Sequence, residues 1–164
     1  MRLVIMAGGK GSRLSIIKPI LTVCGKPILQ RMVESLSPHY ELWVATVRCH
    51  PVDRFVKYYL GINNVLYTDG LGYENDVVKV VRKLGFPLIV VPSDIPFITN
   101  DALKVLIREC KSSLCSLKDI SNSFTGISLW RNEGYFSSFQ DVFLDYSLIN
   151  VNDWNTFLQA NKSC

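Results

Sequence analysis

The chain has 164 residues, of which 48% are apolar and 20% are charged, with a formal net charge of +4. This length predicts one domain with a sizeable core, and the composition excludes a disordered or fibrous chain. The modest positive charge fits an anionic small-molecule substrate. Because no basic run is interleaved with aromatic residues, we expect no nucleic-acid partner.

The N-terminal apolar stretch is about five residues long before glycines interrupt it, which is too short for a signal peptide. No apolar run is long enough to span a membrane. The five cysteines have no C-x-x-C spacing and are accompanied by only two histidines, so we predict neither a zinc site nor a disulfide framework. We expect a cytoplasmic protein with reduced thiols, and the oligomeric state stays open, a homodimer included.

In chain order, short apolar runs alternate with amphipathic segments. The runs at 3–6, 41–47, 65–67 and 86–92 predict buried strands, and helices are expected from Pro27, from Pro51 and over the segment that ends at Gly85. This alternation is typical of βαβ units. It predicts an α/β fold in a single domain, a mostly parallel Rossmann-like sheet sandwiched between two layers of helices.

The second half of the chain is less regular. Thr99 is a candidate N-cap for a helix, and residues 114–117, 125–130 and 148–151 are expected to form strands before a C-terminal helix at about 153–160. No linker or repeat divides the chain. We expect a nucleotide-binding half at about 1–98 and an acceptor-side half at about 99–164 within one domain.

The first strand leads into a glycine-rich loop with two cations, Ala7-Gly8-Gly9-Lys10-Gly11-Ser12-Arg13. Its glycines let main-chain N–H groups approach an anion, while Lys10, Arg13 and Lys18 can neutralise a polyphosphate. The loop lacks the G-x-x-x-x-G-K-S/T spacing of a Walker A motif and the third glycine of a dinucleotide fingerprint. It therefore predicts a nucleoside triphosphate site of another kind, with a simple surface turn as the alternative.

A carboxylate follows the most apolar strand, in Ser93-Asp94-Ile95-Pro96-Phe97. Because ligands gather at the carboxyl ends of parallel strands, Asp94 is expected at the same sheet edge as the glycine loop. A carboxylate there could hold the Mg²⁺ that neutralises a triphosphate. The alternative is an ordinary turn. His39 and His50 lie outside these two segments and are expected to be structural.

The run A-G-G-K-G-S-R-L, followed by K-P-I-L, resembles the signature of nucleotidyltransferases that activate sugar phosphates, molybdopterin and cobinamide phosphate. Ser93 to Phe97 resembles their metal-binding segment, and residues 149–153 resemble a C-terminal element that completes the metal environment. Asp153 and Thr156 depart from that element, and Ser15 stands where a glycine is usual. The alternative for Asn152 and Asp153 is a helix N-cap.

The resemblance implies a role for each matching position. It makes Lys18, Arg13 and Asp94 the catalytic residues, and Asp94 and Asn152 the Mg²⁺ ligands, with Asn150 the less favoured choice. The loop at Asp69 is where the superfamily contacts base and ribose, although a tight turn is an equal alternative. The implied nucleotide-binding residues are Ala7, Gly8, Gly9, Lys10, Gly11, Ser12, Arg13, Lys18, Thr46, Asp69 and Gly70.

Three local matches indicate a branch of the superfamily. Gly72-Tyr73 before an acidic helix start, Cys24-Gly25-Lys26 and residues 125–129 resemble the archaeal adenosylcobinamide-phosphate guanylyltransferases. The resemblance implies transfer of GMP from GTP to a phosphorylated small-molecule acceptor, with pyrophosphate as the leaving group. The alternatives are a molybdenum cofactor guanylyltransferase, a sugar-1-phosphate nucleotidyltransferase and a non-catalytic nucleotide-binding module.

Overall fold

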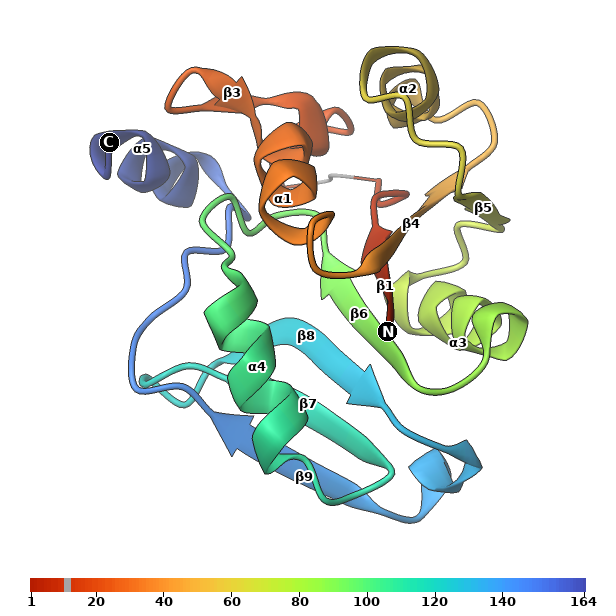
Figure 1. Ribbon diagram of the computed structural model, residues 1–164. Coiled ribbons are helices and arrows are strands. Elements are labelled where there is room, and N and C mark those ends of the chain that lie inside the picture. Colours follow the sequence, from red (N-terminus) through yellow and green to blue (C-terminus); the bar gives the residue numbers. More distant parts are fainter. Residues whose placement is uncertain (11–12) are drawn as a thin grey trace.

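A mixed β-sheet forms the centre of the protein, whose computed structural model describes residues 1–10 and 13–164 (Figure 1). Within these residues the sheet has seven strands in the order β5-β4-β1-β6-β8-β7-β9. Their bounds are β1 Arg2–Met6, β4 Glu41–Val47, β5 Val65–Thr68, β6 Leu88–Pro92, β7 Leu114–Lys118, β8 Phe124–Trp130 and β9 Phe139–Phe143. Strands β5, β4, β1 and β6 are parallel, β8 runs antiparallel to β6 and β7, and β9 is parallel to β7. The predicted α/β class with a mostly parallel sheet is confirmed.

The connections are helices and one small hairpin. In chain order they are η1 Lys18–Ile20, the hairpin β2 Thr22–Val23 and β3 Lys26–Pro27, α1 Ile28–Leu36, α2 Pro51–Arg54, the π-helical η2 Phe55–Tyr59, α3 Tyr73–Leu84, α4 Asn100–Glu109, η3 Glu133–Phe136 and α5 Trp154–Lys162. In the described part of the chain, no helix combines the length and apolar character needed to cross a membrane.

Apolar side chains on the two faces of the sheet form two separate clusters. Leu3 and Ile5 of β1 are fully buried with residues of α1, α4 and α5 on one face. Val4 and Met6 point to the other face, where they pack with α3. Successive side chains of a strand alternate between faces. The unbroken apolar run from Leu3 to Met6 in β1 therefore requires helices on both sides of the sheet, which gives the predicted three-layer arrangement.

One local prediction was wrong, and one strand was not predicted. Residues 148–151 form no strand, and β9, with Phe139 and Phe143 exposed to solvent, was not predicted. Because two of its exposed residues are aromatic, β9 lacks the alternation of buried apolar and exposed polar residues from which a strand is normally recognised. Thr99 occupies the N-cap position of α4, but its side chain makes no capping hydrogen bond.

The expectation of reduced thiols was also wrong for four of the five cysteines. Cys24 pairs with Cys164, and Cys110 pairs with Cys115, with Cα–Cα separations of 5.7 and 5.8 Å. Cys49 is unpaired and exposed. The first pair is separated by 140 residues and forms because α5 packs against the β2–β3 hairpin, where the Cys24 N–H also donates to Asn161. Such a pairing depends on tertiary structure and leaves no spacing signature.

Candidate active site

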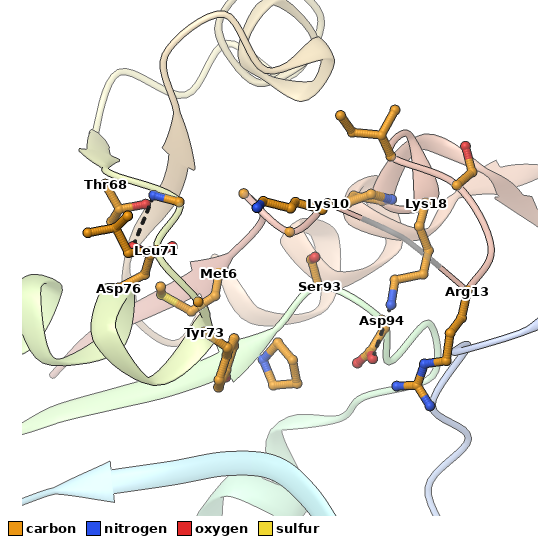
Figure 2. Close-up of a pocket in the computed structure, with 18 residues that line it drawn as sticks. Met6, Lys10, Arg13, Lys18, Thr68, Leu71, Tyr73, Asp76, Ser93 and Asp94 are labelled. Atoms are coloured by element: carbon orange, nitrogen blue, oxygen red, sulfur yellow. Dashed lines mark hydrogen bonds and ion pairs between the residues drawn. The ribbon is translucent and has the colours of Figure 1, made fainter.

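A cavity of about 740 Å³ lies at the edge of the sheet where β1, β5 and β6 end (Figure 2). The loops after these three strands form its walls. The residues from the first loop are Gly8, Gly9, Lys10, Arg13, Ser15, Ile16 and Lys18; those after β5 and β6 include Gly70, Leu71, Gly72, Tyr73, Ser93 and Asp94. The glycine loop and Asp94 therefore share one cavity, as the parallel order of β1 and β6 predicts.

Lys18 and Asp94 form an ion pair at the base of this cavity. The Lys18 Nζ lies 3.5 Å from Asp94 Oδ2, and the two side chains are 20% and 12% exposed. Burial raises the pKa of Asp94, although the Lys18 charge and an Asn150 hydrogen bond oppose the shift. Lys18 is held here because Pro19 restricts the chain in the short helix η1. The pair puts a cation and a carboxylate side by side in one cavity.

The C-terminal segment contacts the site through Asn150, which bonds the side chain of Asp94. Its Nδ2 donates to Asp94 Oδ1 at 3.1 Å and to the Thr125 carbonyl at 3.0 Å. The N–H of Val151 also donates to the main-chain carbonyl of Asp94 at 2.8 Å. The structure thus brings Asn150 to Asp94, whereas Asn152 uses its main-chain N–H to bond Thr156. The role of Asn152 as a metal ligand stays a prediction, and the geometry favours Asn150.

Asp153 is the N-cap of α5. It forms a capping box with Thr156, in which each side chain bonds the main chain of the other residue. Hydrogen bonds from Thr156 lower the pKa of Asp153, with a weaker contribution from the Arg13 charge. The N-cap alternative is therefore confirmed for Asp153. Arg13 is exposed and lies on the Asp94 side of the cavity (Figure 2).

The start of the glycine loop is seated against β4. The Ala7 N–H donates to the Ala45 carbonyl at 2.7 Å, and the Thr46 hydroxyl donates to the Ala7 carbonyl at 3.2 Å. A Cβ on Gly8 would lie 3.1 Å from the main-chain nitrogen of Val47, so any other residue would require the loop or β4 to shift by a few tenths of an ångström. Thr46 is fully buried beneath the loop and does not line the cavity. Gly11 and Ser12 lie outside the described residues.

The loop after β5 faces the glycine loop across the cavity. Gly70 lines the cavity with φ +69°, and its N–H donates to Asp76 at 3.2 Å. Asp69 instead forms an exposed ion pair with Lys79 at 2.9 Å. The nucleotide-binding role of Asp69 stays a prediction, and its side chain is engaged outside the cavity.

Tyr73, the first residue of α3, separates this cavity from a second one. Its hydroxyl donates to the Gly126 carbonyl of β8 at 3.2 Å. Beyond it lies a groove of about 520 Å³ between α3, β7, β8 and η3, lined mainly by apolar side chains such as Val78, Ile127 and Trp130. A ligand that extends past Tyr73 would meet an apolar wall.

Within the described residues, no three His, Cys, Asp or Glu side chains are grouped as a metal centre. Asp94 is a single carboxylate beside an open cavity, a donor set that suits Mg²⁺ because this ion commonly takes one or two carboxylates and completes its shell with phosphate oxygens and water. Cations, main-chain N–H groups and one carboxylate together suit the binding and activation of a polyphosphate.

His50 was expected to be structural and was not connected with the glycine loop, but its Nε2 lies 2.9 Å from the Gly9 carbonyl. Asn150 was the less favoured choice beside Asn152. A lone histidine belongs to no motif, but the place of His50 in the turn after β4, which pairs with β1, indicates that it lies near the glycine loop.

Comparisons with known proteins identify the family of the chain. Residues 3–120 match the family described as MobA-like NTP transferase domain. Adenosylcobinamide-phosphate guanylyltransferase of Methanocaldococcus jannaschii is 32% identical over 99 residues, which cover 56% of this chain and 50% of that protein. The bifunctional protein GlmU of Lawsonia intracellularis is 28% identical over 113 residues, covering 64% of this chain and 25% of that protein. The chain thus spans half or less of the length of these relatives.

The fold has solved counterparts. Molybdopterin-guanine dinucleotide biosynthesis protein A from Archaeoglobus fulgidus superposes with a TM-score of 0.73 at 16% identity, covering 100% of this chain and 98% of that one. At this identity the likeness concerns the fold alone. The family match covers the glycine loop, Lys18 and Asp94, all three of which line the cavity. The chain therefore belongs to the MobA-like NTP transferase domain family.

Proposed function

We propose that the protein is a guanylyltransferase that moves GMP from GTP to the phosphate of adenosylcobinamide phosphate and releases pyrophosphate. The observation that carries this proposal is the meeting of the glycine loop, Lys18 and Asp94 in one cavity. The family membership supports the nucleotidyltransferase chemistry. The need for GTP favours a cytoplasmic location.

In this reaction an oxygen of the acceptor phosphate attacks the α-phosphorus of GTP. A new P–O bond forms while the bond to the β-phosphate oxygen breaks, and that electron pair leaves with pyrophosphate. A phosphate dianion needs no strong general base, so catalysis rests on positioning and charge neutralisation. Lys18 would stabilise charge at the α-phosphate, and Arg13 and the loop N–H groups would hold the β- and γ-phosphates.

Mg²⁺ held by Asp94 would neutralise charge on the triphosphate and orient it. Asn150 would fix the carboxylate through its hydrogen bond at 3.1 Å. Ionised Asp94 is required for this role, and Lys18 helps to keep it ionised against the effect of burial. When an incoming phosphate binds, Lys18 can exchange its carboxylate partner for a phosphate oxygen without leaving the cavity.

Two observations favour cobinamide phosphate as the acceptor. The Methanocaldococcus jannaschii relative carries that activity in its name. The apolar groove beyond Tyr73 suits a large acceptor better than a hexose phosphate, whose hydroxyl groups need polar partners. Molybdopterin is the second candidate, because the Archaeoglobus fulgidus protein has the same fold. A sugar 1-phosphate is the third.

The test is a pyrophosphate-release assay with GTP or ATP against adenosylcobinamide phosphate, molybdopterin and hexose 1-phosphates, with and without Mg²⁺. We expect release only with GTP, Mg²⁺ and the cobinamide acceptor. Preferred turnover of another acceptor would redirect the assignment to that branch. GTP bound without pyrophosphate release by any acceptor would identify a non-catalytic nucleotide-binding module.

Two lysine variants separate chemistry from folding. Lys18→Ala is expected to lower turnover by about 10²-fold or more, the effect of removing one charge-stabilising group at a reacting centre. Lys26→Ala is the matched control, because Lys26 lies on the surface in an ion pair with Glu34 in which both side chains are about half exposed. It should keep wild-type turnover.

A further inference from the structure

His50 links the glycine loop to the start of α2. Its Nδ1 accepts the N–H of Val52 at 3.2 Å, as an N-cap, and its Nε2 lies 2.9 Å from the Gly9 carbonyl. A nitrogen that accepts an N–H carries no proton, so the proton of the neutral ring is on Nε2, which donates to Gly9. His50 as a whole is only 8% exposed. Both nitrogens of a buried side chain are thus engaged.

The carbonyl that His50 holds determines where the next N–H points. In a trans peptide unit the C=O and the following N–H point in opposite directions. Holding the Gly9 carbonyl toward His50 therefore turns the Lys10 N–H away from His50, to the side of the cavity that Gly9 and Lys10 line. Thr46 acts in the same way two residues earlier, because its hydroxyl holds the Ala7 carbonyl and so orients the Gly8 N–H.

The two contacts form a pair beneath the loop. Thr46 and His50 belong to β4 and the turn after it, next to β1 in the sheet. Neither side chain lines the cavity. Among the described residues, the N–H groups of Gly8 and Lys10 have no protein acceptor, so they are available to an anion.

We propose that His50 and Thr46 are positioning residues that orient the main-chain N–H groups of Gly8 and Lys10 toward the triphosphate, by holding the carbonyls of Ala7 and Gly9 from behind. This inference rests on the proposed function and extends it to two residues that do not touch the ligand. Orienting the donors before binding lowers the cost of ordering the loop when the triphosphate arrives.

Two substitutions of His50 separate loop positioning from helix capping. His50→Asn retains an acceptor near the position of Nδ1, which can cap Val52, but does not reach Gly9. His50→Gln places an amide donor near the position of Nε2 but removes the short cap. The two variants should therefore have opposite effects. His50→Asn should keep the stability and lose affinity for GTP, whereas His50→Gln should lose stability and keep the affinity.

The measurement is the Kd of GTP with Mg²⁺ by isothermal titration calorimetry, together with Tm. His50→Asn should raise Kd about tenfold, the effect of one hydrogen bond, with Tm within about 2 °C of the wild type. His50→Gln should stay within about threefold in Kd and lower Tm by several degrees. Thr46→Val, which removes only the hydroxyl donor, should also raise Kd about tenfold. It serves as the test if His50→Asn does not fold.

The outcomes distinguish the two proposals. Unchanged Kd in both His50→Asn and Thr46→Val would overturn the positioning role, as would equal loss of affinity in the Asn and Gln variants, which would indicate general damage. Wild-type protein that binds no GTP would overturn both proposals. A third outcome is that the wild type binds GTP, the two His50 variants show the opposite effects on Kd and Tm, and no pyrophosphate is released. This outcome would support the positioning role and overturn the proposed reaction.

Discussion

Asp94→Asn is the substitution that most directly tests the site, because it removes one charge and almost no volume. The attraction between charges 3.5 Å apart is about 5 kcal/mol at an effective dielectric constant of 20. Desolvation of the two partly buried groups costs several kcal/mol per ion and offsets this attraction. The net contribution of the pair to folding is therefore small.

Two further features keep the cost to stability low. The Asn side chain retains an oxygen that can accept the Asn150 hydrogen bond, and the freed Lys18 can be hydrated in the open cavity. The raised pKa of Asp94 also means that the site disfavours the charged form. We expect the free energy of unfolding to change by no more than about 1 kcal/mol.

The effect on activity is expected to be much larger. A neutral amide is a poor ligand for Mg²⁺, so kcat should fall about 10²- to 10³-fold, the effect of losing one preorganised electrostatic group. The assays are pyrophosphate release and urea denaturation. Glu34→Gln, the same chemical change in an exposed ion pair, should leave both unchanged. Activity of Asp94→Asn above about one third of wild type would refute this reasoning.

Three other outcomes are expected. The folded-state pKa of Asp94 is raised above the ordinary carboxyl pKa of 3.8, so the folded protein holds this proton to higher pH than the unfolded chain does. The free energy of unfolding should therefore fall as pH rises from 3.8 through the raised pKa. Because Mg²⁺ competes with the proton for the carboxylate, the acid limb of the activity profile should move to lower pH as the Mg²⁺ concentration increases. Gly8→Ala should weaken GTP binding by displacing the loop from β4, whereas Gly9→Ala, whose added methyl group would meet no atom within 4 Å, should leave Tm unchanged. Loss of the long-range disulfide in Cys164→Ser should destabilise by up to about 5 kcal/mol, and Cys115→Ser by about 2, on the chain-entropy account, as urea denaturation can measure.

The sheet and the shared cavity could be predicted because they depend on local patterns. Apolar runs of strand length at β1, β4 and β6 alternate with helix-length amphipathic segments, and parallel strands must end at the same edge. The placement of Asp94 opposite the glycine loop follows from these two facts. No knowledge of side-chain contacts is needed for either.

The contacts that complete the site could not be predicted, because each depends on a path of the chain with no repeating pattern. Asn150 reaches Asp94 from an irregular segment 56 residues away, and it was mistaken for part of a strand. His50 is a single histidine that belongs to no motif, and no spacing in the sequence indicates its contact with the Gly9 carbonyl. The Cys24–Cys164 pair requires α5 to return to the hairpin that follows the glycine loop.

The reversed direction of β8 has a consequence for how the molecule could be divided. Strand β6 ends at the site edge of the sheet, whereas the antiparallel strand β8 begins at that edge. The carbonyls of Thr125 and Gly126, near the start of β8, therefore accept hydrogen bonds from Asn150 and Tyr73. A cut between residues 98 and 99 would leave Asp94 on one fragment and Asn150 on the other. We expect each fragment alone to lack the proposed activity, and activity to return only when β6 and β8 pair again, so the boundary between these strands is a position at which to split the protein as a reporter.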